Sequence, residues 1–323
     1  MTSGAEAVPT GVDPKLKNPR PATAEELAWE RKYMKIAGGS GAVAGVLLLI
    51  SFFLKASALK SSSSDADKVL RVAHKNASTL QVVAVLEAIS IILTIVALYY
   101  LWRAARHRAD VAKIIPALLI AGGLAVGILN FMSEFAVISA ASDFVKHPVA
   151  HTNLGAITDP DKYRAAVEDL APKKHAENIV RDHFSTGKQL ALYLLNVVWG
   201  AGLALTSLVA MRTGLLSRFI GILGLIVGVL YAVPLLGGGG GLLQFVWYVA
   251  VGLVISNVWP GGRGPAWDSG EPVRWPGAAE KRLAMEDGRP APANGTPPPD
   301  GPDDESSARA QRRKRKKRGG SRR

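Results

Sequence analysis

Hydrophobic and polar positions divide the chain into long apolar blocks separated by charged stretches. Six blocks of 18 to 28 residues hold at most one charged residue each. A helix needs about 20 apolar residues to cross roughly 30 Å of hydrocarbon, and soluble core helices rarely stay apolar for so long. The pattern therefore predicts an all-α, polytopic transmembrane bundle of about six helices. The blocks cover residues 36–54, 80–102, 114–141, 189–211, 219–236 and 242–259.

Polar segments flank the predicted transmembrane domain, which covers residues 36–260. In the N-terminal segment, residues 1–35, Thr23 and Glu26 have the spacing of a capping box, so a short interfacial helix is expected to lead into the first block. Residues 261–323 contain Pro and Gly, then a short acidic stretch, then a basic one. That composition cannot bury a core and predicts a disordered basic tail.

Basic residues between the blocks predict the orientation, because short connections rich in Lys and Arg stay in the cytoplasm. The connection between the second and third blocks and the one between the fourth and fifth both carry such residues. This pattern predicts that both ends of the chain are in the cytoplasm. The residues are Arg103, Arg106, Arg108, Lys113, Arg212 and Arg218.

Two longer connections are then expected outside. Residues 142–188 carry seven bases and seven acids, a balance typical of a translocated loop. Residues 55–79 carry five bases and two acids, which argues the other way. We place residues 55–79 outside because the opposite choice would reverse two better-supported connections.

The first block has an alternative interpretation as a signal peptide. Ala56, Ser57 and Ala58 follow it and resemble a signal-peptidase site, and cleavage would leave five spans. About 35 polar residues precede the block, however, and its 19 apolar residues exceed a usual signal-peptide core. We therefore predict that it is retained as a span.

Two glutamates lie within the predicted spans, Glu87 in the second and Glu134 in the third. An ionisable side chain in lipid costs about 2.5 to 3.5 kcal/mol on insertion scales, so it usually faces the bundle interior or water. Helical spacing places Glu87 on a face with Ser90 and Thr94. Both glutamates, together with Asn130 and Asn196, are expected near one level on the outer side.

These polar residues support two hypotheses. In the first, Glu87 and Glu134 bind a proton or cation in an outward-biased cavity, with Asn130 and Asn196 as hydrogen-bond partners. In the second, the glutamates are hydrated or paired near the outer interface and only lock the bundle together. The bases considered as partners in the second hypothesis are Lys75, Lys146 and Lys188.

The sequence gives little support for thiol chemistry, metal binding or an enzyme activity. The chain has no cysteine, which excludes disulfides, thiol nucleophiles and iron–sulfur clusters. His147 and His151 are four residues apart, but Pro148 between them argues against a helix that would align them on a metal. We find no hydrolase, zincin or phosphate-binding motif, and we predict no enzyme, no metal and no cofactor.

The charged end of the tail is the other candidate binding region. The net charge of +13 comes largely from residues 309–323, which hold ten Lys or Arg and no acid. Anionic lipid headgroups are the expected partner, and nucleic acid is the alternative, although no aromatic residue offers a stacking platform. The unbroken basic run is Arg312, Arg313, Lys314, Arg315, Lys316, Lys317 and Arg318.

One stretch resembles a known group of sequences. The run Met211–Arg218, followed by Gly221, Gly224 and Gly228, is similar to a family of uncharacterised bacterial multi-pass membrane proteins of unknown function. The resemblance also takes in the five-glycine stretch and residues 259–267. It implies the architecture and the plasma membrane, and it implies no activity.

The sequence therefore predicts a membrane protein without a defined activity. A structural or interaction protein of the envelope is favoured, because only two charges lie within the spans and no inverted repeat is visible. The alternative is a small proton- or cation-coupled transporter that uses Glu87 and Glu134.

Overall fold

The computed structural model describes residues 16–59, 65–146, 159–162, 172–183, 186–233, 240–260, 262–273 and 275. These residues belong to one compact unit, Val12–Trp275. The second unit, Met1–Gly11 with Pro276–Arg323, lies outside them. The predicted basic run at residues 312–318 and the histidines at 147 and 151 therefore also lie outside the described residues.

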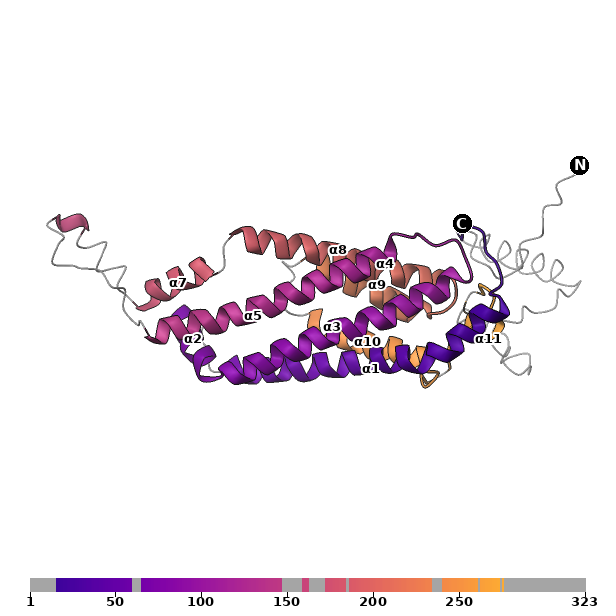
Figure 1. The fold of residues 1–323 in the computed structure, drawn as a ribbon, viewed down its shortest axis with the longest axis horizontal. Helices are drawn as coiled ribbons and strands as arrows, with labels where there is room; N and C mark the ends of the chain where they lie inside the picture. The colour runs from indigo at the N-terminus through magenta and orange to yellow at the C-terminus, as the bar shows by residue number, and fades with distance from the viewer. Residues whose placement is uncertain are drawn as a thin grey trace, which may run out of the picture. The chain divides into compact units, whose positions relative to one another are not determined.

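Long helices dominate the fold (Figure 1). Four apolar helical stretches are long enough to cross a membrane: α1 (Ala24–Leu59), α3 (Ala77–Arg106), the stretch Ile115–Lys146, and α8 (Thr186–Arg212), in which the apolar span is Leu190–Arg212. Two further apolar helices are shorter, α9 (Arg218–Ala232) and α10 (Gly240–Ile255). The prediction of a helical protein with membrane-spanning helices is thus confirmed for four of the six blocks.

The predicted number of about six helices is too low for the fold as a whole. The described residues form ten α-helices with defined bounds and one π-helix, besides a short helical stretch at residues 160–162. Three of the additional helices lie in the predicted loops and tail: α2 (Ala66–Lys75), α7 (Pro172–His183) and α11 (Pro265–Ser269). A count of long apolar blocks does not include them, because they are short and polar or amphipathic.

The third apolar block is divided into three helical pieces. It begins with α4 (Ile115–Ala117), continues as the π-helix η1 (Leu118–Gly122) and ends as α5 (Gly123–Lys146). Pro116 lies in the first of these pieces and has no backbone N–H to donate. At Gly122 an added Cβ atom would lie 3.1 Å from the backbone nitrogen of Trp199, so η1 packs closely on α8.

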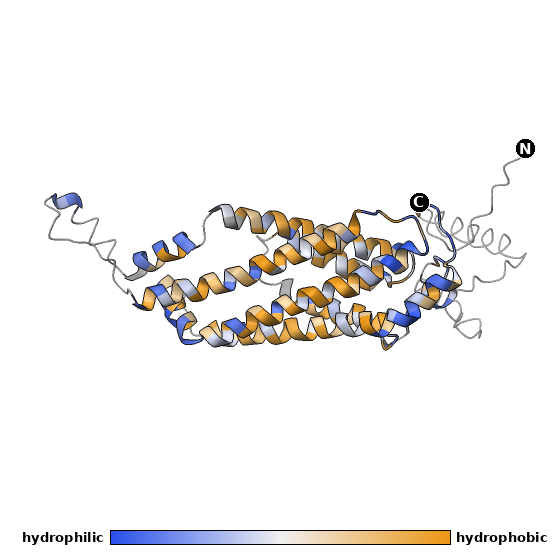
Figure 2. Ribbon diagram, viewed as in Figure 1, coloured by the Kyte–Doolittle hydropathy of each residue, from blue (hydrophilic) through white to orange (hydrophobic). Residues whose placement is uncertain are grey.

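On α1, large apolar side chains point outward from the bundle, and small ones point inward. The exposed residues of this helix include Ile36, Val46 and Phe53, whereas Gly38, Gly41 and other small residues are buried. Hydrophobic residues cover the central stretches of the helices, and hydrophilic residues gather toward their ends (Figure 2). Such a surface is unfavourable in water and suits lipid, where small residues mediate helix contacts.

Glycine contacts bring two helix pairs close together. A Cβ atom added at Gly252 of α10 would lie 2.3 Å from the Ala42 nitrogen and 2.6 Å from the Gly38 oxygen of α1. One added at Gly200 of α8 would lie 2.3 Å from the oxygen of Gly228 in α9. The two shorter helices are therefore packed backbone to backbone against long ones.

A set of charged and aromatic residues closes the bundle at the end where α1 begins. Arg108 is fully buried there, and its Nη1 and Nη2 groups donate to the two carboxylate oxygens of Glu30 at 2.6 and 3.0 Å. His107 Nδ1 lies 2.9 Å from Glu30 Oε1, and Arg108 Nε donates to the Ala266 carbonyl at 2.9 Å. We call Glu30, His107, Arg108 and α11 the Arg108 cap.

Part of the predicted tail belongs to this cap. Trp267 of α11 is 5% exposed, and its Nε1 group donates to the Leu215 carbonyl at 2.9 Å. Trp275 Nε1 donates to the Gly214 carbonyl at 2.9 Å. The packed part of the chain therefore extends beyond the predicted tail boundary at residue 261.

The N-terminal segment also packs on the Arg108 cap. The Arg20 backbone N–H donates to the Arg108 carbonyl at 2.9 Å. The predicted capping box is confirmed, because the Thr23 N–H donates to Glu26 Oε2 at 2.8 Å and the Glu26 N–H donates to Thr23 Oγ1 at 3.3 Å. The helix that starts here is not a separate interfacial helix, since α1 runs from Ala24 through the predicted span without a break.

The opposite end of the bundle has a smaller apolar cluster, which we call the Phe144 cap. Phe144 of α5 is fully buried against α2 and α7, and the guanidinium carbon of Arg71 lies 5.2 Å from the centre of its ring. His183 Nε2 of α7 lies 3.3 Å from Asp143 Oδ2 of α5. Both predicted exterior loops thus contain helices that pack on the spans. The pattern of charged and apolar residues at 161–181 also predicts an amphipathic helix. α7 covers its second half, and residues 163–171 lie outside the described residues.

Candidate functional site

The face of α3 that carries Glu87 packs on α1, as the helical spacing predicts. Ser90 and Thr94 on this face are each 1% exposed. The Ser90 hydroxyl donates to the Ala44 carbonyl of α1 at 2.8 Å, and the Thr94 hydroxyl donates to the Ser90 carbonyl at 2.8 Å. Glu87, one turn before Ser90 on this face, is half-buried beside α1.

Glu134 lies on α5, on a face that packs against α3. The glycines at 123 and 127 on this face are buried, and both lie against isoleucine side chains of α3. The Glu134 side chain is 12% exposed. A carboxylate with so little water around it needs a charged partner.

Lys55 of α1 is that partner. Its Nζ group forms an ion pair with Glu134 Oε1, and its side chain is 38% exposed. Lys55 follows the predicted end of the first span at Leu54, but α1 continues to Leu59. The ammonium group is therefore held inside the bundle, with part of its chain still in contact with the surroundings.

Glu87 completes a cluster of three charged side chains. It lies close enough to Lys55 and to Glu134 to interact electrostatically with both. The cluster joins α1, α3 and α5, and it sets two carboxylates against one ammonium group. Among the described residues, Glu87 has no ion pair within 4.0 Å, whereas Glu134 has Lys55. We call Lys55, Glu87 and Glu134 the charge cluster.

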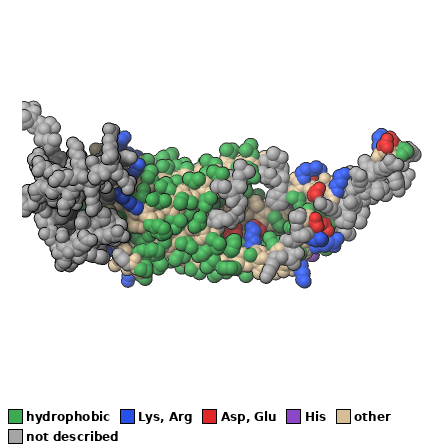
Figure 3. Space-filling model, turned by 180° about the vertical axis from the view of Figure 1, so that it is seen from behind, with side chains coloured by type: hydrophobic (Ala, Val, Ile, Leu, Met, Phe, Trp, Pro, Cys, Tyr) green, Lys and Arg blue, Asp and Glu red, His purple; other side chains and the backbone are tan. Residues whose placement is uncertain are grey.

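Acidic and basic side chains are visible together in a recess of the largely apolar central face (Figure 3). A charged group in such surroundings is costly unless it is paired or hydrated.

The two predicted asparagine partners are not joined to this cluster by a hydrogen bond among the described residues. Asn130 and Asn196 are both half-buried. The bases Lys75 and Lys146, which the sequence offered as partners of the glutamates, are exposed on α2 and at the end of α5. The side chain of Lys188 lies outside the described residues.

Lys55 could have been found from the sequence by one signal. It is the first charge after the first apolar block, and a helix that continues one more turn carries it toward the level of Glu134. The sequence analysis began the exterior loop at Lys55 and so did not consider it a partner of Glu134. Hydropathy shows where charged residues begin, but it does not show where the helix ends.

A second polar group of side chains lies deeper in the bundle, between α3, α9 and α10. Gln244 Nε2 donates to the Tyr248 hydroxyl at 3.2 Å and also to the Tyr231 hydroxyl. Both tyrosine hydroxyls therefore accept from the same amide group, and Thr94 of α3 lines the same small cavity as Tyr248. Tyr231 lies within electrostatic range of Glu87. We call Thr94, Tyr231, Gln244 and Tyr248 the hydroxyl network.

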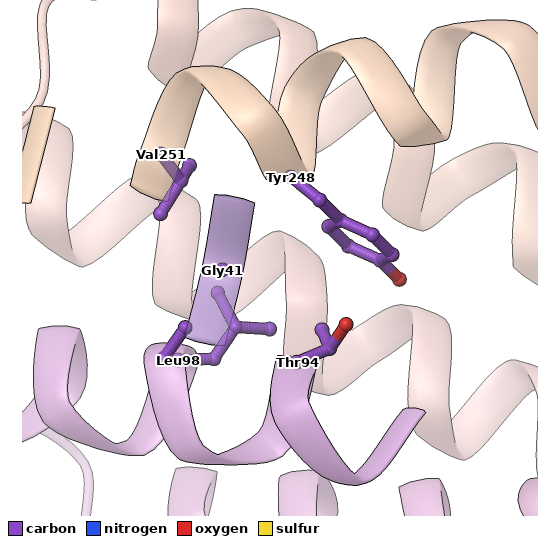
Figure 4. Close-up of a pocket in the computed structure, with 6 residues that line it drawn as sticks. Gly41, Thr94, Leu98, Tyr248 and Val251 are labelled. Atoms are coloured by element: carbon purple, nitrogen blue, oxygen red, sulfur yellow. The ribbon is translucent and has the colours of Figure 1, made fainter. Parts of the chain in front are cut away.

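A small cavity adjoins the hydroxyl network. It is lined by Gly41, Thr94, Ala97, Leu98, Tyr248 and Val251 and has room for about one water molecule. The Tyr248 and Thr94 hydroxyl oxygens point toward the same space between the helices (Figure 4). The sequence analysis placed Thr94 on this face but did not identify the tyrosines or Gln244.

Metal binding finds no support in the described residues, which contain no group of three or more His, Asp or Glu side chains that could hold an ion. His175 and His183 lie on α7 in the Phe144 cap, where His183 contacts Asp143. His107 lies against Glu30 in the Arg108 cap. These histidines have structural contacts.

Comparisons with known proteins assign no function to the chain. No family model matches the chain, and neither a curated protein nor a solved structure matches it.

Proposed function

We propose that the protein is a six-span integral protein of a bacterial plasma membrane that binds a proton or small cation at the charge cluster and couples it to transport. The sequence by itself favours a structural role. The observation that supports transport is the meeting of Lys55, Glu87 and Glu134 between α1, α3 and α5.

The charge balance of the cluster supports this proposal. Two carboxylates and one ammonium group leave one net negative charge, which is unfavourable in surroundings of low polarity. Binding one proton or one monovalent cation would make the cluster neutral. The bound species would sit near Glu87, because Glu134 already has Lys55 as its partner.

Six crossings require that α9 and α10 also span the lipid. Their 15 and 16 residues give lengths of roughly 22 to 24 Å, somewhat less than the hydrocarbon thickness. Apolar residues continue each block beyond the helix end, and short spans are tolerated by local thinning of the bilayer. Their close packing on α8 and α1 supports this placement.

Single-cysteine labelling tests the crossings and the orientation. The chain has no cysteine, so each introduced thiol is the only one that a membrane-impermeant maleimide can label. Replacements at Asp67 and Glu177 are expected to react from outside intact cells, and one at Asp268 only after permeabilisation. Labelling of Asp268→Cys in intact cells would contradict the cytoplasmic C-terminus.

Reconstitution tests the activity. The purified protein in sealed vesicles is expected to respond to an imposed pH or cation gradient with flux above that of empty vesicles. Glu87→Gln should lower the flux at least tenfold, because it removes the unpaired carboxylate. Glu177→Gln, which changes an exposed acid on α7, should leave it within twofold. Equal flux in all three proteins would refute the site.

A structural or interaction role in the envelope is the second candidate. The observation that favours it is the Phe144 cap, in which α2 and α7 place charged side chains outside the spans. A photo-cross-linker at Arg181 should then capture one envelope protein in cells, and a cross-linker at lipid-facing Ile128 should not. Absence of a specific product at Arg181 would count against this role.

The proposed partner of the basic run at residues 312–318 is anionic lipid on the cytoplasmic surface. Each Lys or Arg near such a surface contributes about 1 kcal/mol. A chain that ends near residue 300 should bind vesicles with anionic lipid more weakly than the full chain, whereas binding to neutral vesicles should be equal. A tail that prefers RNA over anionic vesicles would favour the nucleic-acid alternative.

A further inference from the structure

We propose that Arg103 and Trp29, together with a lysine beside them on α1, form a binding site for the phosphate of an anionic phospholipid at the Arg108-cap end of the bundle. This site is separate from the charge cluster and from the basic run at residues 312–318, and it does not depend on transport. The observation that points to it is a half-buried guanidinium group that is held over an aromatic ring and has no acceptor for its N–H groups among the described residues.

Aromatic contacts fix Arg103 between α1 and α3. Its guanidinium carbon lies 4.2 Å from the centre of the Trp29 ring. Tyr100, one turn before Arg103 on α3, stacks on the same indole at 5.3 Å between ring centres. A planar guanidinium group packs well over an indole, and this contact limits the conformations that the side chain can adopt. The position of the charge is therefore set before a ligand binds.

The N–H groups of Arg103 remain available for that ligand. A guanidinium group has five N–H donors, and none of them is used in a hydrogen bond or an ion pair within the part of the chain that the structure describes. Two acids of α1 have other partners. Glu26 is paired with Arg20 at 2.7 Å, and Glu30 with the Arg108 side chain at 2.6 Å. A phosphate suits the free group, because two of its oxygens can accept from one guanidinium at once.

Positive charge is in excess around this site. Lys32 Nζ lies 5.4 Å from the centre of the Tyr33 ring, which is 5.2 Å from the centre of the Trp29 ring. Lys35, one turn after Lys32, is exposed, and neither lysine has an ion pair among the residues described. Such an excess attracts a headgroup with a net negative charge more strongly than a zwitterionic one, whose own cation the bases repel.

The site lies where the lipid-facing surface ends. Ile36, two turns after Trp29 on the same face of α1, is 61% exposed. On α3, Val96 is 40% exposed and lies two turns before Arg103. Two turns correspond to roughly 10 Å along a helix, and aromatic and basic residues at this distance from lipid-facing side chains are typical of the headgroup level. Lys and Arg side chains are visible where the apolar face of the bundle ends (Figure 3).

The neighbouring apolar surface favours a lipid over a soluble phosphate. Inorganic phosphate can accept the N–H groups of Arg103, but it makes no contact with Ile36 or Val96. A phospholipid satisfies both parts of the site, because its phosphate lies at the guanidinium group and its acyl chains cover the exposed apolar side chains.

Lipid binding to matched arginine variants tests the site. The full chain, purified in detergent and stripped of lipid, is titrated with phosphatidylglycerol, and native mass spectrometry counts the lipids bound to each chain. Arg103→Gln is expected to weaken the tightest binding at least fivefold. Arg218→Gln removes the same charge from an exposed position at the start of α9 and should stay within twofold. Phosphatidylcholine should bind the unmodified chain at least fivefold more weakly than phosphatidylglycerol.

The possible results decide between the site and its alternatives. Weaker binding in Arg103→Gln alone supports the site, and the basic run at residues 312–318 cannot explain it, because both variants keep that run. Equal affinity in the two variants overturns the site. Equal affinity for the two lipids overturns the choice of an anionic headgroup, and displacement of the lipid by millimolar inorganic phosphate overturns the choice of a lipid. Arg103→Lys, which keeps the charge without the planar group, is the second variant if Arg103→Gln does not fold, and it should weaken binding about threefold.

Discussion

Lys55 of α1 is ion-paired with Glu134 of α5, so two helices distant in sequence are joined by opposite charges inside the apolar bundle. Glu87 lies beside this pair and shares its positive charge. The cluster is therefore neither a lone buried acid nor a fully balanced pair. Its excess of one carboxylate is the basis of the proposed activity.

Loss of the lysine should destabilise the protein. Lys55→Met leaves Glu87 and Glu134 without a positive partner, and the expected cost is about 3 kcal/mol, similar to that of one uncompensated charge in a membrane helix. Thermal unfolding in detergent would show a lower midpoint. Lys75→Met, which changes an exposed base on α2, should leave the midpoint nearly unchanged.

A double variant refines this prediction. Lys55→Met together with Glu134→Gln removes both charges of the pair and should recover part of the lost stability, since the two side chains are in contact. Simple addition of the two single effects would mean that the pair does not interact in the folded protein.

The Arg108 cap should depend on the shape of the guanidinium group. Arg108 reaches both oxygens of Glu30 and one carbonyl of α11, and an ammonium group cannot make these bonds together. We expect Arg108→Lys to cost about 3 kcal/mol of unfolding free energy. Arg106→Lys, at an exposed position two residues earlier, should cost less than about 0.5 kcal/mol. Equal costs would show that the cap does not need the bidentate pair.

Two glycines should respond to alanine with opposite signs. At Gly252 the added carbon meets backbone atoms of α1 that cannot move aside, so overpacking is expected to cost about 1 to 3 kcal/mol. At Gly39 nothing lies within 4 Å of the added carbon, and alanine should stabilise the helix by up to about 1 kcal/mol. Denaturation of both variants in the same detergent measures the difference, and a stable Gly252→Ala would place α10 farther from α1.

The four helices that are long and apolar enough to cross a membrane could be predicted from the sequence, because lipid imposes a simple rule on length and polarity. The inward face of α3 was also predictable, since Ser90 and Thr94 repeat at helical spacing and are buried. The capping box at Thr23 and Glu26 needed only local spacing. In each case a local pattern determines the structure.

Long-range pairing was not predictable in this way. Lys55 and Glu134 are 79 residues apart, and Glu30 and Arg108 are 78 apart. Arg108 served as a marker of the cytoplasmic side, yet its side chain is fully buried. The charge of a residue indicates a side of the membrane, whereas its partner depends on how the helices pack. The contacts among Tyr231, Gln244 and Tyr248 could not be predicted either, because they depend on the packing of α9 against α10.

Carbodiimide modification of the reconstituted protein tests the charge cluster most directly. An apolar carbodiimide reacts with a carboxyl group that carries a proton in apolar surroundings, and mass spectrometry locates the product. Our account predicts modification at Glu87, slower modification at Glu134 beside Lys55, and loss of flux in step with the labelling of Glu87. An unlabelled Glu87, or full flux after it has been labelled, would contradict the account.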